Sequence, residues 1–220
     1  MYNLKKIFLA AIVACITILG ISFFAVRRHS THHTATPLFH HNIQQLKELC
    51  YAKYRQSIRF MAYANHAMRD SMPTTAALFH AMARADAIHL SNCRHAIEAL
   101  GGRVSLPIIT PTTFTHSVAH LENALSSKWQ THYDHMPAYI TQALADNNRY
   151  VARMLTWCDA CDAKQILLLR QILNDSVHRK YHFHVCPTCG DITWEEVRTR
   201  HCPQCMTESE KFFVIEPTAR

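Results

Sequence analysis

Glycine is scarce in this sequence, with only four in 220 residues. An all-β fold rich in tight turns would need more of them, whereas the many Ala, Leu, His, Arg and Met residues favour long helices. An apolar fraction of 49% is enough for one packed domain and an additional hydrophobic segment, and it argues against disorder. We therefore expect a mostly α-helical protein.

Acidic residues are absent from the first 28 residues, which contain Lys5, Lys6, Arg27 and Arg28. These four account for much of the formal net charge of +7, because the rest of the chain has 19 basic against 16 acidic residues, or +3. No basic stripe with interleaved aromatic residues stands out in that remainder. Composition and charge therefore exclude nucleic-acid binding as the expected function.

Charged residues are also absent from Ile7 to Val26. Twenty uncharged residues in a helix are long enough to cross a hydrocarbon core of about 30 Å. We therefore expect residues 1–28 to be a single-pass membrane anchor, with the soluble part outside the cytoplasm. A cleaved signal peptide, or a lipoprotein cleavage box that ends at Cys15, are the alternatives.

Beyond a His-rich linker at residues 29–41, apolar residues recur with helical spacing in four segments. The first two are separated by a break at residues 71–73, and the second ends at Gly101. The connection from Gly101 to Pro111 is longer than an antiparallel hairpin needs. The third and fourth helices are expected at residues 116–145 and 148–177. Two helical pairs joined by a long crossover predict a ferritin-like four-helix bundle.

Two short cysteine motifs lie near the C-terminus. The sequence reads Cys-Pro-Thr-Cys-Gly from Cys186 and Cys-Pro-Gln-Cys-Met from Cys202. Two residues between cysteines let both thiolates reach one cation, and two such knuckles complete a tetrahedron. Cys186, Cys189, Cys202 and Cys205 are therefore predicted to bind one iron or zinc ion, since both metals accept four thiolates. Two disulfides are the alternative.

A four-helix bundle with a long crossover, followed by these two motifs, resembles rubrerythrin over about residues 40–218. The resemblance implies a ferritin-like bundle at residues 42–178 and a small rubredoxin-like metal ribbon at residues 181–218. Rubrerythrins are peroxide-reducing, non-haem iron proteins, in which a di-iron site in the bundle receives electrons from a rubredoxin-type centre. The resemblance also implies a homodimer, as ferritin-like bundles often form.

The positions that bind iron in that family are largely altered here. Lys53 and Lys128 replace glutamates of the first and third helices, while Asp86 with His89 and Asp162 keep groups that can bind metal. The two remaining positions are occupied by Thr131 and Gln165. Two ammonium groups repel cations, so we expect no conventional di-iron centre.

The lysines have a specific predicted role in this bundle. Lys53, Lys128 and the two aspartates fall on inward helix faces, where an unpaired charge costs several kcal/mol. We therefore predict that each ammonium meets Asp86 or Asp162 across the core, with Lys–Asp distances under about 5 Å. In the alternative, the helices are rotated and the lysines extend to solvent.

Four other cysteines lie on the predicted helices. Cys50 and Cys93 are expected as buried free thiols, with a disulfide as the alternative. Cys158 and Cys161 could hold a metal together with Asp162, although a Cys-x-x-Cys within a helix is a poor redox motif.

The sequence thus predicts a membrane-anchored, rubrerythrin-like protein that acts as an electron-transfer or structural metal module and has a redox partner protein. One alternative is an active rubrerythrin-type peroxidase with an altered site at Asp86, His89 and Asp162. Another is a zinc-ribbon interaction scaffold without a redox role.

Overall fold

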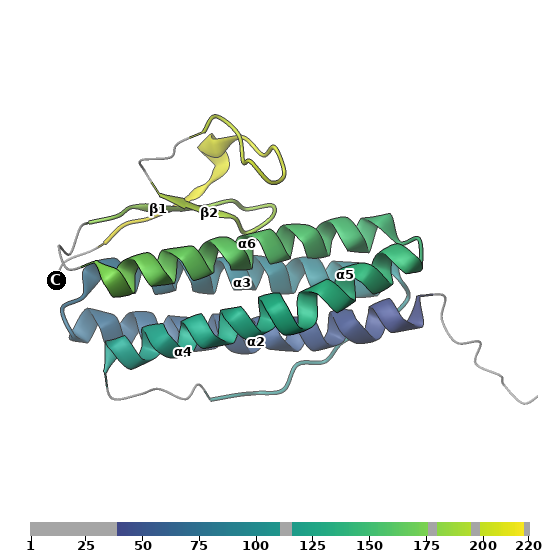
Figure 1. Ribbon diagram of the computed structural model, residues 1–220, viewed down its shortest axis with the longest axis horizontal. Coiled ribbons are helices and arrows are strands. Elements are labelled where there is room, and N and C mark those ends of the chain that lie inside the picture. Colours follow the sequence, from purple (N-terminus) through teal and green to yellow (C-terminus); the bar gives the residue numbers. More distant parts are fainter. Residues whose placement is uncertain (1–38, 111–115, 176–179, 195–198, 218–220) are drawn as a thin grey trace, which may run out of the picture. The chain divides into compact units, whose positions relative to one another are not determined.

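The computed structural model describes residues 39–110, 116–175, 180–194 and 199–217. Within these residues, four long helical rods lie side by side and a small sheet covers part of their surface (Figure 1). Residues Pro37–Arg220 form one compact unit. The structure therefore confirms a mostly helical bundle with a small β-sheet domain.

The first helical pair consists of α2, His40–Arg69, and α3, Pro73–Ala99. The turn between them places Ser71 in the left-handed region, with φ of 58°, and Pro73 at the start of α3, where a missing N–H costs nothing. At the other end of α3, Gly101 has φ of 80° and the Gly102 N–H bonds to the carbonyl oxygen of Ile97. This is the glycine stop that the sequence predicted.

The second pair differs from the prediction in one respect. The expected third helix is divided into α4, Ser117–Gln130, a π-helical turn η1, Thr131–His135, and α5, Met136–Ala145. Because a π turn adds a residue, the buried stripe moves from His135, which is exposed, to Met136, which is buried. His135, which follows Lys128 by seven residues and would share its face in a regular α-helix, therefore lies outside the buried stripe.

The last bundle helix is α6, Arg149–Asn174, shorter by three residues at its end than predicted. Its N-cap Asn148 accepts a hydrogen bond from the Val151 N–H at 3.2 Å, as an N-cap asparagine does. The Asn148 side chain also donates to Asn42 of α2 at 3.0 Å. The N-terminal ends of α2 and α6 therefore lie at the same end of the bundle.

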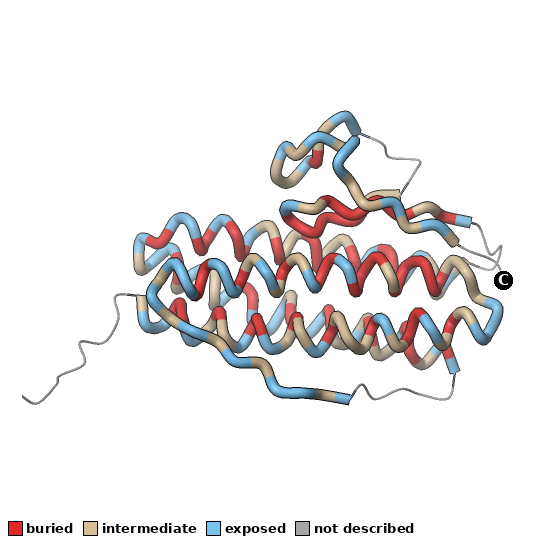
Figure 2. Tube along the Cα trace, turned by 180° about the vertical axis from the view of Figure 1, so that it is seen from behind, coloured by how far each residue is buried: buried red, intermediate tan, exposed pale blue. Residues whose placement is uncertain are grey.

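The small sheet has three antiparallel strands in the order β2-β1-β3. These are β1, Phe183–Val185, β2, Ile192–Trp194, and β3, Phe213–Ile215, with a short 3-10 turn η3, Ser209–Lys211, before the last. Phe183, Val185 and Ile192 belong to the same buried cluster as Phe79 and Met82 of α3. The buried side of the sheet therefore shares its core with the helices (Figure 2).

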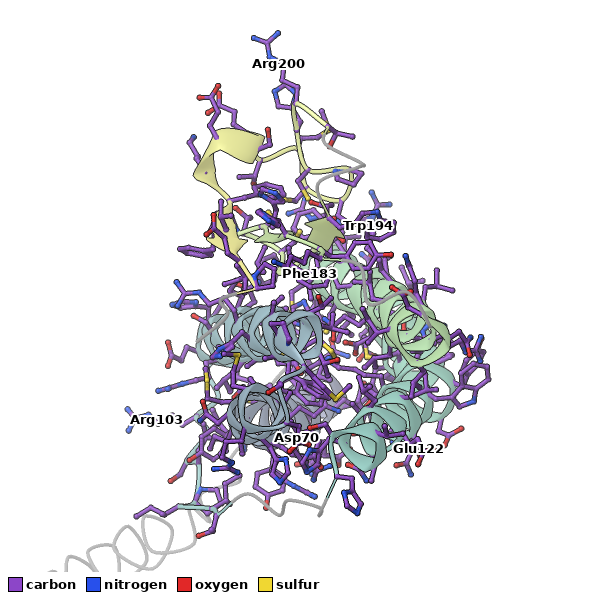
Figure 3. The ribbon with its side chains drawn as sticks, turned by 90° about the vertical axis from the view of Figure 1, so that its left-hand side faces the viewer. Asp70, Arg103, Glu122, Phe183, Trp194 and Arg200 are labelled. Carbon is purple, nitrogen blue, oxygen red and sulfur yellow. The ribbon has the colours of Figure 1, made fainter. Side chains whose placement is uncertain are left out.

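Seen along the helix axes, Phe183 lies between the sheet and the helices, while Arg200 marks the part of the sheet domain farthest from them (Figure 3). In the described ranges of the chain, no helix is both long and apolar enough to cross a membrane. The predicted anchor at residues 1–28 and most of the linker lie outside those ranges.

Candidate functional site

The four cysteines of the two knuckles lie together at the edge of the sheet domain. The Sγ atoms of Cys186 and Cys205 are 3.5 Å apart, as are those of Cys189 and Cys202, and all four sulfurs lie within 4.8 Å of one another. A tetrahedral site with metal–sulfur bonds of about 2.3 Å has sulfurs about 3.8 Å apart. The donor set and its spacing therefore fit one four-coordinate iron or zinc ion.

Each knuckle is built by the same backbone turn. The Gly190 N–H bonds to the Cys186 carbonyl oxygen at 3.0 Å, and the Met206 N–H bonds to that of Cys202 at 3.0 Å. Both turns need a left-handed residue after the second cysteine, with φ of 77° at Gly190 and 63° at Met206. Glycine adopts this conformation freely, whereas Met206 adopts it at some cost.

The thiols interact strongly because they are so close. Hydrogen bonds from Cys189 and Cys202 lower the pKa of Cys186, and Cys186 in turn raises the pKa of Cys202. Three of the four cysteines are buried, and only Cys205 is partly exposed. The Cys205 thiol lies 3.1 Å from the Thr207 hydroxyl. The site thus has an inner side against the bundle and an outer side towards solvent.

The first knuckle, Cys186–Cys189, is held by side chains of the bundle. We call it the inner knuckle. His89 Nε2 donates to the carbonyl oxygen of Cys189 at 2.8 Å, and the Cys161 thiol lies 3.5 Å from the same oxygen. Asn92 Nδ2 donates to the carbonyl oxygen of Thr188 at 2.9 Å. These contacts come from α3 and α6 and fix the backbone beside the metal ligands.

Two further features hold the inner knuckle close to α3 and α6. Lys164 Nζ pairs with both carboxylate oxygens of the buried Asp191 at 2.8 Å. A Cβ atom at Gly190 would lie 2.7 Å from His89 Nε2 and 3.0 Å from the carbonyl oxygen of Ala85. The absence of a side chain at Gly190 therefore lets the knuckle approach α3.

A layer of four charged side chains crosses the bundle beneath this knuckle. Lys128 Nζ lies 2.7 and 2.9 Å from the two carboxylate oxygens of Asp86 and 2.8 Å from Asp162. Lys53 Nζ lies 2.5 Å from Asp162 and 3.3 Å from Asp86. All four side chains are 0% exposed. We call these four residues the ion-pair layer; its formal charge is zero.

The ionised state of the layer follows from this geometry. Burial alone would raise the pKa of the two carboxyl groups, but the ammonium groups of Lys128 and Lys53 outweigh it and lower the pKa of both Asp86 and Asp162. Burial would lower the pKa of Lys53, but Asp162 and Asp86 raise it well above its usual value. Each charge is thus stabilised by its opposite.

His89 links the ion-pair layer to the knuckle. Its Nδ1 lies 3.5 Å from Asp86 Oδ1, while its Nε2 bonds to the carbonyl oxygen of Cys189. Burial opposes a charged imidazole, but the neighbouring Cys158 and the carboxylate of Asp86 raise the pKa of His89 to about 9. One side chain therefore contacts both the charged layer and the backbone of a predicted metal ligand.

The bundle does not fit a di-iron centre. Ligand atoms of Asp86, His89 and Asp162 do lie within 4.8 Å of one another. However, both carboxylates already hold the two ammonium groups, so a cation there would meet two positive charges instead of the several carboxylates that two iron ions need. The predicted Lys–Asp pairs are present, and the alternative in which the lysines reach solvent is wrong.

The structure also places the other residues that the sequence analysis singled out. Thr131 donates to the carbonyl oxygen of Ser127 at 3.1 Å, and Gln165 is fully buried in α6. Cys50 and Cys93 are buried free thiols, as expected. Within the described segments, Cys158 and Cys161 belong to no cluster of three ligands closer than 4.8 Å, so the structure does not support a metal held by them with Asp162.

Sequence reasoning missed the residues that dock the knuckle. Asn92, Cys161, Lys164 and Asp191 carry no recognisable motif, because their role depends on where the sheet domain lies against α3 and α6. A weak signal existed only for Gly190, since a glycine after the second cysteine distinguishes the first knuckle from the second.

Comparisons with known proteins agree with this fold. No model of a known protein family matches the sequence, and none of the curated proteins matches it. Among solved structures, fully reduced, all-ferrous nigerythrin matches with a TM-score of 0.69 at 19% identity, covering 79% of this chain and 86% of nigerythrin. Mixed-valent nigerythrin matches with a TM-score of 0.68 at 20% identity and the same coverage.

Ferritins match over a smaller share of this chain than nigerythrin does. The Chlorobium tepidum ferritin has a TM-score of 0.54 at 16% identity, and the match covers 60% of this chain and 81% of the ferritin. An open-pore ferritin from Archaeoglobus fulgidus has a TM-score of 0.53 at 13% identity, with coverage of 60% and 82%. Nigerythrin is a rubrerythrin-type protein, so the ferritin-like bundle and the resemblance to rubrerythrin are confirmed at the level of the fold.

Proposed function

We propose that this chain is a membrane-anchored, rubrerythrin-like protein that binds one iron or zinc ion at Cys186, Cys189, Cys202 and Cys205. The observation that carries the proposal is the convergence of four sulfurs within 4.8 Å, on two knuckles with the same backbone turn. Four-thiolate coordination without an open position is typical of structural zinc and of rubredoxin-type iron.

The metal decides which role the module has. Iron in four thiolates would exchange one electron between its ferrous and ferric states, whereas zinc has no redox chemistry. The chain's own contribution is to fix the inner knuckle through His89 and Asn92 and to keep Cys189 away from water. The ion-pair layer replaces a second metal centre, so electrons would pass to or from a redox partner protein.

Metal analysis of the purified full chain tests this proposal. We expect one bound ion per chain, with a red rubredoxin-like absorption spectrum for iron or a colourless protein for zinc. Cys186→Ser should lose the ion, while Cys50→Ser, which replaces a buried thiol outside the knuckles, should keep it. A protein without bound metal, or with an unchanged metal content after Cys186→Ser, would refute the site. A colourless zinc form would favour the interaction scaffold over electron transfer.

The membrane anchor and the homodimer rest on sequence and resemblance. Twenty uncharged residues from Ile7 to Val26 support the anchor. Deletion of residues 1–28 should move the protein from the membrane fraction to the soluble fraction, and reporter fusions at both ends should place the C-terminal part outside the cytoplasm. Light scattering of the truncated protein should give the mass of a dimer.

A second candidate is a peroxidase that uses Asp86, His89 and Asp162. The proximity of these three ligands favours it, but both aspartates pair with lysines. Peroxide consumption by the iron-loaded chain with a reductant separates the candidates. The proposed module should show no turnover that depends on Asp162, whereas turnover that Asp162→Asn abolishes would establish the peroxidase.

A further inference from the structure

Three thiols that the proposed function does not use lie next to the ion-pair layer. Cys50 of α2, Cys93 of α3 and Cys158 of α6 are 0%, 0% and 2% exposed. All three are free, and all belong to one packed cluster together with the buried Met136 of α5. Three helices thus bring three sulfur ligands into the same part of the core.

Helix direction places these thiols on one side of the ion-pair layer. Cys50 precedes Lys53 by three residues and Cys158 precedes Asp162 by four, so each lies about 4.5 to 6 Å closer to the N-terminus of its helix. The N-terminal ends of α2 and α6 meet through Asn42 and Asn148. Because α3 follows α2 through a tight turn and runs back along it, Cys93, four residues after His89, lies in the same direction.

Cys93 lies near both of the other thiols in this group. Burial raises the pKa of its thiol, and the neighbouring Cys158 and Cys50 raise it further. Cys158 in turn lies near the ammonium group of Lys53, since it contributes to the raised pKa of that lysine. The thiolate is the form of cysteine that binds metals.

We propose that Cys93 and Cys158, with Cys50 beside them, bind one soft monovalent cation of the Cu(I) type. Soft thiolate ligands select Cu(I), and this part of the core offers sulfur together with apolar side chains such as Leu46 and Leu155. In the described part of the chain, the three sulfurs do not all lie within 4.8 Å. The site that we propose accordingly needs only two thiolates, which satisfy Cu(I) but not tetrahedral zinc. Each thiol that binds releases one proton to solvent.

The test uses the full chain with zinc already bound at the knuckles. Every preparation also carries Cys15→Ser, which removes the thiol of the one cysteine outside the described residues. Cu(I) is added without oxygen against a colorimetric competing chelator, while released zinc is measured. We expect one Cu(I) per chain to bind without loss of zinc. Cys93→Ser should weaken this binding on the order of 100-fold. Ala96→Ser, which introduces a hydroxyl group into the same buried cluster but removes no thiol, should leave it unchanged.

Two results would overturn the inference: copper that binds only as zinc leaves, and a first equivalent that Cys93→Ser does not weaken. X-ray absorption of the copper-loaded wild-type chain gives a measurement that needs no variant. A shell of sulfur neighbours alone supports the site, and nitrogen or oxygen neighbours contradict it. Zinc retention is read in the same titration, so failure of the copper site is distinguishable from failure of the knuckle site.

Discussion

The ammonium group of Lys128 lies between the two carboxylate oxygens of Asp86, at 2.7 and 2.9 Å, in a layer that is closed to water. The same ammonium reaches Asp162, which Lys53 also contacts. Two positive and two negative charges thus neutralise one another without a metal ion. Since all four charges are buried, removal of any one of them leaves an opposite charge without a partner and destabilises the folded protein.

Removal of one lysine should therefore be costly. Lys128→Met leaves both aspartates with Lys53 as their one lysine partner, and we expect the free energy of unfolding to fall by about 3 to 5 kcal/mol. Denaturant unfolding of the zinc-loaded protein measures this loss. The control is Lys211→Met, because Lys211 forms an ion pair with Glu208 that is mostly exposed. That variant should lose much less stability, because solvent screens an exposed ion pair. Equal losses in the two variants would contradict the account.

Replacement of the whole layer should have a different effect. With Lys53→Met, Lys128→Met, Asp86→Leu and Asp162→Leu combined, none of the four charges of the ion-pair layer remains. Buried ion pairs replaced by apolar side chains of similar volume are often neutral or stabilising by about 1 to 4 kcal/mol. We expect the fourfold variant to be at least as stable as the wild type in the same denaturant experiment. A loss equal to the sum of the single losses would show that the charges stabilise the fold independently.

Acid should destabilise the wild-type protein through this layer. The pKa of both Asp86 and Asp162 is lower in the folded chain than in the unfolded chain. The unfolded state therefore takes up protons first, and the stabilisation present above about pH 4 is lost as the pH falls towards the folded pKa values. Unfolding measured from pH 5 down to pH 2 should give a steeper loss for the wild type than for the fourfold variant. Equal slopes would show that other groups control acid unfolding.

The two knuckles offer a matched pair of substitutions. Gly190→Ala puts a methyl group 2.7 Å from His89 Nε2 and 3.0 Å from backbone at a left-handed position, so it should displace the inner knuckle from α3 and cost about 1 to 3 kcal/mol. Met206→Gly relieves the left-handed strain of an exposed residue, and it should be neutral or stabilising by about 1 kcal/mol. Thermal melting and limited proteolysis of the zinc-loaded variants measure both effects. A stable, protease-resistant Gly190→Ala protein would mean that the knuckle is not docked as described.

Much of the fold could be predicted because the first, second and fourth helices each have a continuous inward stripe and a clear end. The Ser71–Pro73 turn and the Gly101 stop follow from local backbone chemistry. The π turn at Thr131–His135 could not be predicted, since a one-residue insertion into a helix leaves no composition signal. Pro137, which has no N–H to donate back to the carbonyl oxygen of Tyr133, is the one local hint of irregularity.

The candidate site was predictable in part. Spacing alone identified the four knuckle cysteines, and the inward stripes placed Lys53 and Lys128 opposite the aspartates. The contact of His89 with Cys189 was not predictable, because it joins residues 100 positions apart through the packing of the sheet on α3. The sequence reading considered Cys50 and Cys93 together but did not add Cys158, because that cysteine lies on another helix far along the chain.

The most direct test of the central claim is the iron content of the full chain after anaerobic reconstitution with ferrous iron. The ion-pair layer should exclude iron from the bundle, so the wild-type chain should hold one iron, at the knuckles. In Lys53→Glu/Lys128→Glu, four carboxylates replace the neutral layer, and the content should rise towards three. A wild-type chain that itself holds three irons would contradict the account, because the two lysines would then not have replaced the cations of a di-iron site.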